Sequence, residues 1–376
     1  MNNVSKSHSD DIGLKYFDEL YKLRLGGANY LDQPFMSGVK ESVVEKYSDQ
    51  AHFIYELIQN ADDASATKAS FVLKKDRLIF IHNGTRCFTI TDPKREEEDK
   101  KNGILGDLNA ITSIGHSSKT PASIGKFGLG FKAVFQYTDT PRICDKNIHI
   151  DLKRFIVPEK IEDDVEGRKL LETGFEFPFN HEDRNAEESV EDIKYKLNNL
   201  KYPILFLRNL KRIDFTTQDG KGYYKEIIKE EKRFDTSIFN NKKIQTTVKL
   251  IEINKKINDK EEKEFLYLFT RETKPERYVY SVGFFLNEDL KSIKPKDIDA
   301  FCFFTTKKHT NLKFIINAPF LLTDSREGIR AGKTHNINLI EKLSELAADS
   351  FIYLKEIGKE KKVSYINDDN KISGNY

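Results

Sequence analysis

The chain has few of the features that mark secreted, membrane-spanning or metal-scaffolded proteins. Its 376 residues include three cysteines, Cys87, Cys144 and Cys302, and no two of them form a C-x-x-C pair. This spacing argues against a disulfide scaffold and against a structural zinc site. No apolar run approaches the roughly 20 residues that a membrane-spanning helix needs, and the first residues lack the apolar segment of a secretory signal. We therefore expect a cytoplasmic protein without a membrane partner.

The chain also lacks an excess of charge of either sign. It has 62 Lys and Arg against 60 Asp and Glu, which gives a net charge of +2. This balance does not support a nucleic-acid partner, although it is compatible with a local basic patch. The length is too great for one compact core of ordinary size, so two domains are expected.

The most informative stretch is the helical pattern at residues 53–64, Phe-Ile-Tyr-Glu-Leu-Ile-Gln-Asn-Ala-Asp-Asp-Ala. Glu56 and Asn60 are four residues apart, so their side chains share one helix face. A carboxylate can act as a general base, and an amide oxygen is a ligand suited to Mg²⁺. The pair predicts nucleotide hydrolysis, provided that a phosphate-binding loop lies elsewhere in the chain.

Such a loop is predicted at residues 124–131, Ile-Gly-Lys-Phe-Gly-Leu-Gly-Phe. Gly125, Gly128 and Gly130 follow the spacing G-x-x-G-x-G, which lets the backbone approach a ligand closely. Backbone N–H groups that lead into a helix N-terminus bind phosphate. A tight structural turn is the alternative, and the pattern is neither a P-loop nor a dinucleotide-binding fingerprint. Further donors to the same phosphates are expected from Ser117, Ser118, Lys119 and Lys126.

Hydrophobic periodicity predicts helices and hairpins in the first half and a strand-rich second half. Gly26–Gly27 is expected to end the first helix, and the charged residues 92–103 are expected to form a solvated loop. The predicted helices cover 12–24, 37–64, 104–113, a segment ending near 200, and 336–357. The predicted strands are 69–73, 77–82, 142–151, 175–179, 204–215, 223–229, 244–253, 264–271, 278–286, 300–305 and 312–318.

Four ordered blocks resemble the GHKL superfamily of gyrase, the ninety-kilodalton heat-shock chaperone, histidine kinases and MutL. Residues 56–64 resemble its N-box, and residues 81–84, Ile-His-Asn-Gly, stand in the place of its Asp-x-Gly box. Residues 114–119 are similar to the Ser/Thr-Lys segment of the chaperone, and residues 124–131 to the glycine-rich lid box. The sequences of these blocks resemble the chaperone branch most, and within it the N-terminal ATPase domain of the sacsin type.

This resemblance implies a Bergerat fold, a sandwich of mixed sheet and helices that binds ATP and Mg²⁺ beneath a mobile lid. Glu56 would then activate water, Asn60 would hold Mg²⁺, and Asp63 would lie near the nucleotide edge of the helix. The lid box would cover the phosphates through Gly125, Lys126, Phe127, Gly128, Leu129, Gly130 and Phe131.

A fifth block, residues 318–329, resembles the middle-domain loop of the chaperone. In that family an arginine in this loop reaches the γ-phosphate, and Arg326 holds its place here. A guanidinium offers a fixed fork of donors to a phosphoryl group; the alternative is a surface arginine or a structural ion pair. The expected organisation is an ATP-binding domain with an N-terminal strap at 1–185, a strand-rich α+β middle-like domain at 186–335, and a C-terminal helix and tail at 336–376.

Two positions depart from the family pattern. The aspartate that reads adenine in the family is replaced by His82, followed by Asn83 and Gly84. His82 in one tautomer, or the side-chain oxygen of Asn83, could accept the adenine amino group; otherwise His82 is a strand-end histidine without a ligand. The family's Gly-Thr pair is also reversed to Thr173-Gly174, which predicts that Thr173 does not reach the base.

The resemblance thus implies a Mg²⁺-dependent ATPase of the heat-shock chaperone and sacsin type. ATP would close a lid and a homodimer through the N-terminal domain, with residues 1–30 as a strap, and protein clients are unspecified. The alternative is a nucleotide-dependent interaction module of a multi-protein system, such as a prokaryotic defence apparatus, with slow or no turnover. A histidine kinase is disfavoured because His8 lies in a polar tail and His52 inside the N-box helix. A MutL-like role in DNA repair gains no support from the net charge.

Overall fold

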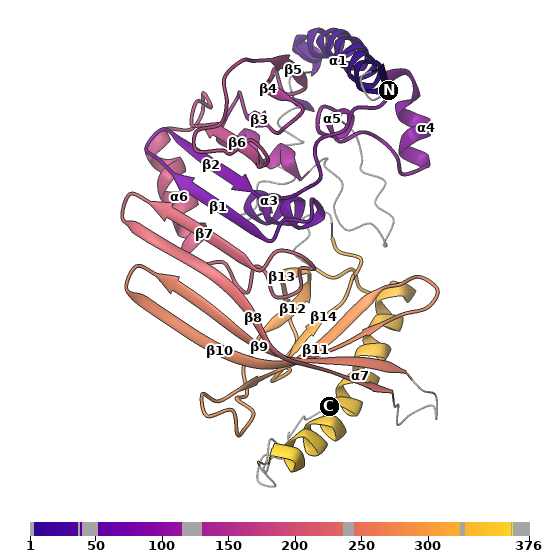
Figure 1. Ribbon diagram of the computed structural model, residues 1–376, viewed down its shortest axis with the longest axis vertical. Coiled ribbons are helices and arrows are strands. Elements are labelled where there is room, and N and C mark those ends of the chain that lie inside the picture. The colour runs from indigo at the N-terminus through magenta and orange to yellow at the C-terminus, as the bar shows by residue number, and fades with distance from the viewer. Residues whose placement is uncertain are drawn as a thin grey trace. The chain divides into compact units, whose positions relative to one another are not determined.

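The computed structural model describes residues 4–36, 38–39, 52–114, 130–235, 244–323, 328–361 and 363 (Figure 1). The chain divides into two compact units. Unit 1 comprises residues 1–200 and 207–223, and unit 2 comprises residues 201–206 and 224–376. This division differs from the expected boundaries at 185 and 335, because the helix at 186–198 falls within unit 1 and the C-terminal helix within unit 2.

Unit 1 is built on a mixed sheet with the strand order β7-β1-β2-β6-β3-β4-β5. β1 and β7 pair in parallel, and the other neighbours pair antiparallel. The predicted hairpin of strands 69–73 and 77–82 is confirmed within one residue. The strands are β1 (Lys68–Leu73), β2 (Arg77–His82), β3 (Arg142–Cys144), β4 (His149–Lys153), β5 (Val157–Lys160), β6 (Thr173–Pro178) and β7 (Arg212–Thr217).

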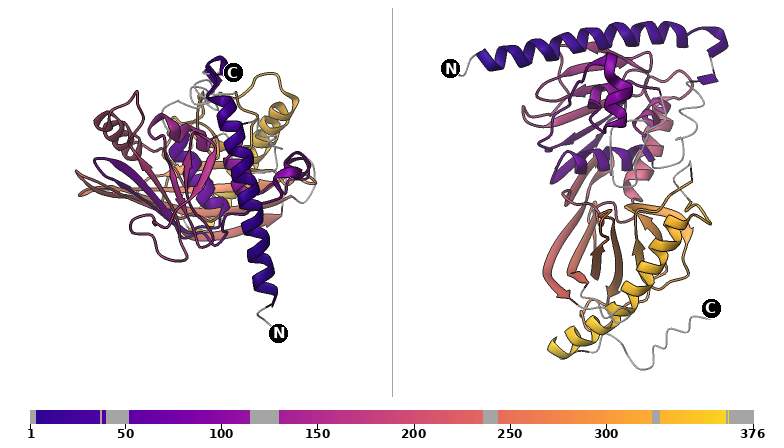
Figure 2. Two further views of the ribbon diagram at one scale, coloured as in Figure 1. Left: turned by 90° about the horizontal axis from the view of Figure 1, so that it is seen from above. Right: turned by 90° about the vertical axis from the view of Figure 1, so that its right-hand side faces the viewer.

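Helices of unit 1 pack on this sheet and on one another. α3 contacts η3, α6 contacts β1, and α1, the long indigo helix of Figure 2, contacts β5. Ring contacts among Phe80, Phe131, Phe175 and Phe177 join β2, β6 and the start of η3 into one buried core. The helices are α1 (Val4–Leu31), η1 (Pro34–Met36), α3 (His52–Asp63), η2 (Pro93–Arg95), α4 (Glu96–Lys101), α5 (Asp107–Ile111), η3 (Phe131–Gln136) and α6 (Ala186–Asn198).

The first helix continues through the pair of glycines that was expected to end it. α1 spans 28 residues, and Gly26 and Gly27 lie inside it. Tertiary packing explains the error, because Phe17, Leu20 and Ala28 are buried. Burial of apolar side chains outweighs a helix penalty of about 1 kcal/mol for each glycine. The prediction of a break at this point was therefore wrong.

The charged segment 92–103 is also more ordered than the sequence indicated. It forms η2 and α4, and the Asp92 side chain accepts a hydrogen bond from the Lys94 N–H at 2.9 Å. Acidic residues occupy the first turn of α4 and lysines its last turn, which suits the helix dipole. The Glu96 carboxylate contacts the Arg24 guanidinium at 2.5 Å, so this segment also holds α1 in place.

Unit 2 contains one long helix and the remaining strands of a 14-stranded mixed sheet, in the order β13-β12-β14-β11-β10-β9-β8. α7 (Thr334–Lys361) covers one face through Leu339, Leu343 and Leu346, and a second hydrophobic cluster fills the other face. The structure adds β13, which was not predicted, and places residues 204–211 before the strand expected there. The strands are β8 (Gly220–Asp235), β9 (Gln245–Ile257), β10 (Lys260–Glu272), β11 (Val279–Leu286), β12 (Asp299–Cys302), β13 (Phe304–His309) and β14 (Ile315–Asn317).

The protein is therefore an α+β fold with a large mixed sheet and several helices, as predicted at that level. Among the helices that the structure describes, none is both long and apolar enough to cross a membrane.

Candidate functional site

Polar side chains are buried along one face of the apolar helix α3. Phe53, Ile54, Leu57 and Ile58 are all nearly inaccessible, as expected for a helix packed inside a domain. Glu56 is only 8% exposed and Asn60 only 3%, so neither is a solvated surface group. Burying a carboxylate and an amide costs free energy unless they are paired. Their burial, one helical turn apart on the same face of α3, indicates a candidate functional site.

The end of the glycine-rich segment lies directly against the Glu56 carboxyl group. A Cβ atom placed on Gly130 would be 2.1 Å from Glu56 Cδ, 2.3 Å from Oε2 and 2.5 Å from Oε1. Gly130 has a φ of −65° in the right-handed helical region, so backbone strain does not require glycine here. Glycine is required here by the close approach of the two residues, because any side chain at position 130 would collide with the Glu56 carboxylate. The structure thus brings together Glu56 and one residue of the predicted phosphate loop.

The residues that follow Gly130 turn into the core. The Phe131 ring is 1% exposed and lies 6.2 Å from the Phe175 ring centre, so it packs in the core and does not face a ligand. Lys132 is fully buried, and its ammonium donates to the Phe155 carbonyl at 2.6 Å. Burial holds the pKa of Lys132 well below its ordinary value, with a further contribution from Arg24. Lys132 therefore has a structural role.

The two aspartates at the end of α3 have different positions. The Asp62 carboxylate accepts backbone N–H groups of Arg208, Asn209 and Leu210 at 2.7–3.1 Å. Asp62 therefore fixes the approach to β7 and has a structural role. Asp63, the predicted nucleotide-edge residue, is half-buried and does not line the pocket described below.

Asn83 and Gly84 hold the end of β2 against the turn after α3. The Asn83 side-chain oxygen accepts the N–H groups of Thr67 and Lys68 at 3.0 and 2.9 Å. Asn83 is exposed and does not line the pocket, so its oxygen is not placed to accept an adenine amino group. A Cβ on Gly84 would be 2.8 Å from atoms of Ala64 and of His82, which explains the glycine.

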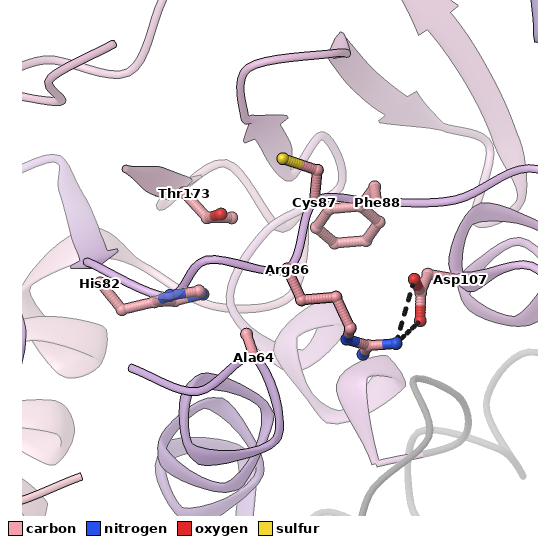
Figure 3. A pocket seen from close by; sticks show the side chains of 7 residues that line it. All are labelled: Ala64, His82, Arg86, Cys87, Phe88, Asp107 and Thr173. Carbon is pink, nitrogen blue, oxygen red and sulfur yellow. Dashed lines mark hydrogen bonds and ion pairs between the residues drawn. The ribbon is translucent and has the colours of Figure 1, made fainter. Parts of the chain in front are cut away.

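A small pocket opens where the ends of β2 and β6 meet α3 and α5 (Figure 3). His82 and Thr173 are partners in the β2–β6 register and face it together. Thr173, which was expected not to reach a base, lines this pocket. The pocket's cavity volume of about 10 Å³ is roughly that needed by one water molecule. The lining residues are Ala64, His82, Arg86, Cys87, Phe88, Asp107 and Thr173.

An ion pair forms the side of the pocket away from His82. Arg86 Nη1 lies 3.1 Å from Asp107 Oδ1, and Figure 3 shows the two side chains facing each other. Asp107 also accepts the Thr89 hydroxyl at 2.9 Å. Sequence reasoning missed both residues. Arg86 follows the Asn83-Gly84 turn and could have been noted as a nearby cation, but nothing in the sequence pairs it with Asp107.

A second group of side chains could in principle bind a metal ion, but an arginine already occupies it. Cys144, His149 and Asp164 place ligand atoms within 4.8 Å of one another, a spacing that could hold a metal ion. The Arg168 guanidinium already lies among them, donating to both Asp164 oxygens at 2.5 and 2.7 Å and to His149 Nε2 at 3.1 Å. The Arg168 guanidinium therefore supplies the positive charge in this cluster, and the cluster has a structural role.

Several predicted site residues lie outside the part of the chain that the structure describes. They belong to the polar loop, the glycine-rich loop and the arginine loop: Ser117, Ser118, Lys119, Gly125, Lys126, Phe127, Gly128, Leu129 and Arg326. The described part brings Gly130 against Glu56, one helical turn from Asn60, and places His82 in the pocket near the end of the same helix.

The fold and the site define an α+β domain with buried polar groups along one helix and a small pocket at the ends of two neighbouring strands. Residues 33–172 match the family model of the Sacsin domain. This range includes Glu56, Asn60, His82 and Gly130, and it supports the resemblance to the sacsin type over that stretch.

Two curated proteins are similar to part of the chain. Protein NO VEIN of Arabidopsis thaliana is 31% identical over 112 residues, which are 28% of this chain and 4% of that protein. Sacsin of Homo sapiens is 30% identical over 123 residues, which are 29% of this chain and 2% of that protein. The chain thus spans a very small part of the length of either relative.

Proposed function

We propose that unit 1 binds a nucleoside triphosphate with Mg²⁺ and hydrolyses it, in a Bergerat-type site of the heat-shock chaperone and sacsin kind. The observation that carries the proposal is the contact between Gly130 and the Glu56 carboxyl group. It joins the end of the glycine-rich segment to a buried carboxylate that is one helical turn from Asn60. ATP is the nucleotide that the sequence resemblance implies.

The described residues fit such a ligand. Glu56 would accept a proton from the attacking water, and Asn60 would offer its amide oxygen to Mg²⁺. The bound Mg²⁺ would neutralise charge on the phosphates. The base would lie towards the end of β2, because Ala64, the residue that follows α3, lines the same small pocket as His82.

Nucleotide binding and turnover by variants of the buried pair test this function. Glu56→Gln keeps the shape beside Gly130 but removes the base, so it should bind MgATP normally and turn over at least about 100-fold more slowly. Asn60→Ala should lose the Mg²⁺-dependent part of binding. Glu187→Gln, an exposed carboxylate on α6, is the matched control.

Three outcomes can be separated. Binding and turnover by the wild type, with loss of turnover in Glu56→Gln, support hydrolysis. Binding without turnover in the wild type favours the alternative of a nucleotide-dependent interaction module. No nucleotide binding by the wild type contradicts the proposal.

A further inference from the structure

We propose that Asp192, on α6, is a positioning residue for the proposed hydrolysis. It holds the end of η3 on α3, and it thereby keeps Gly130 against the Glu56 carboxyl group. The inference rests on the proposed function of unit 1 and adds a residue to it. Asp192 lies beyond residues 33–172, the range that matches the family model.

Both ends of η3 meet α3. At the start of η3, Gly130 lies against the Glu56 carboxyl group. At its end, the ring of Tyr137 lies with its centre 4.9 Å from that of Phe53, and both residues are 2% exposed. Phe53 precedes Glu56 on α3 by nearly one helical turn. Because η3 is short, a shift of Tyr137 on Phe53 would also move Gly130 relative to Glu56.

A charged cluster on and beside α6 fixes Tyr137. The Tyr137 hydroxyl donates to Asp192 Oδ2 at 2.6 Å, and Lys196 Nζ donates to the phenol oxygen at 2.6 Å and to Oδ2 at 2.9 Å. Arg184 donates to the same Oδ2 at 2.7 Å, with its guanidinium 4.4 Å from the centre of the Tyr137 ring. Burial and the hydrogen bond to Asp192 raise the pKa of Tyr137, so the phenol keeps the proton that it donates. Asp192 is therefore the acceptor on which the whole cluster depends.

The helix that carries this cluster is itself firmly held. α6 contacts β1, and its residues Ile193 and Leu197 are buried in the core of unit 1. The Asn185 side chain caps its first turn by accepting a backbone N–H at 2.8 Å. The Lys196 ammonium also lies 5.8 Å from the centre of the Phe53 ring. The cluster thus ties the end of η3 and the start of α3 to one rigid element.

Loss of the Asp192 charge should loosen this arrangement. Lys196 and Arg184 would lose their shared anionic acceptor, and the Tyr137 hydroxyl would lose a charge-assisted hydrogen bond. A small misplacement of a catalytic group lowers the rate of the chemical step, because that step depends on alignment with the reacting atoms. We therefore expect a change in turnover that is not matched by a change in nucleotide affinity.

Kinetics of Asp192→Asn, which keeps the size of the side chain and removes its charge, test the inference. We expect kcat to fall about tenfold or more, while the dissociation constant of MgATP stays within about twofold of the wild-type value. Asp214→Asn is the matched control. Asp214 is 27% exposed against 28% for Asp192, and it also pairs with two cations, Arg212 and Lys68, which lie on β7 and β1. This control should change neither quantity.

Amide hydrogen exchange over residues 130–137 gives a second measurement that needs no nucleotide. Exchange there should be faster in Asp192→Asn than in the wild type, and unchanged in Asp214→Asn. Tyr137→Phe keeps the ring on Phe53 and removes only the hydroxyl, so it should show the same two effects at smaller size. It takes the place of Asp192→Asn if a thermal melt shows that Asp192→Asn does not fold.

The outcomes separate this inference from the proposed function. Unchanged kcat or unchanged exchange in Asp192→Asn overturns the positioning role while hydrolysis stands. Equal losses of kcat in Asp192→Asn and Asp214→Asn, or a loss of affinity as large as the loss of kcat, overturn it as well. A wild type that binds nucleotide without turnover overturns the positioning role and leaves binding in place. A wild type that binds no nucleotide overturns both.

Discussion

His82, Asn83 and Gly84 are consecutive residues at the end of β2, and each is used differently. His82 faces the pocket, Asn83 ties the strand to Thr67 and Lys68, and Gly84 permits close packing on Ala64. The sequence could place all three at a strand end. It could not separate their roles, because the partners of Asn83 are 15 and 16 residues away in the chain. The hydrogen bond from the Gly84 N–H to His82 Nδ1, at 3.1 Å, likewise depends on a backbone position that only the fold provides.

The buried His82 predicts a specific dependence of stability on pH. Its pKa is about 3 in the folded state and near 6.5 when unfolded, so below pH 6.5 the unfolded chain binds the extra proton. Stability is therefore lost as pH falls from 6.5 towards 3. Relative to His82→Asn, which does not titrate, the wild type should lose roughly 2 kcal/mol more between pH 7 and pH 5. Urea unfolding of both proteins at each pH measures this, and parallel losses would contradict the neutral buried ring.

Gly130 provides a test of the contact that defines the site. Gly130→Ala would place a Cβ 2.1 Å from Glu56 Cδ, so we expect a loss of about 1–3 kcal/mol in unfolding free energy together with loss of turnover. If the collision is the cause, the same change in a Glu56→Ala background should cost much less. Equal losses in both backgrounds, measured by denaturant unfolding, would contradict the contact.

Among the elements, the β1–β2 hairpin and α1 show where sequence reasoning succeeds and where it fails. The hairpin was predicted within one residue because alternation and a short turn are local signals. The continuation of α1 through Gly26 and Gly27 was not predictable locally, because it depends on burial of residues such as Leu20 and on the Arg24 contacts with Glu96 and Thr112. The same limit hid the pairing of Arg86 with Asp107.

A substitution inside α1 tests its continuity. A Cβ on Gly26 would meet no atom within 4 Å, and the φ of this residue is not positive, so Gly26→Ala should stabilise the protein by about 0.5–1 kcal/mol. Gly84→Ala, where the Cβ would be 2.8 Å from Ala64, is the opposing control and should destabilise. A decrease in melting temperature for Gly26→Ala would contradict a continuous helix at this point.

At the scale of the whole molecule, the Sacsin-domain match covers residues 33–172 and thus lies within unit 1. Unit 2 has two hydrophobic clusters and the long helix α7. Sequence reasoning anticipated its strand-rich character and this helix. The expected role of Arg326, which lies outside the described residues, is a link drawn from the sequence resemblance alone.

Turnover by Arg326→Ala tests that link. An arginine that stabilises charge on the transferring phosphoryl group contributes to turnover more than to binding. We therefore expect at least about a 100-fold lower kcat with little change in nucleotide affinity. Arg233→Ala, a surface arginine of unit 2 with a side chain 65% exposed, is the matched control. Unchanged turnover in Arg326→Ala would leave this arginine without a role in hydrolysis.

The most direct test of the proposed function is nucleotide binding and hydrolysis by the wild type beside Glu56→Gln, with Mg²⁺ and with both ATP and GTP. We predict that both proteins bind nucleotide and that only the wild type hydrolyses it at a substantial rate, with at least about a 100-fold difference. Absence of binding by the wild type, or equal turnover by the two proteins, would contradict the assignment of Glu56 to a nucleotide-hydrolysing site.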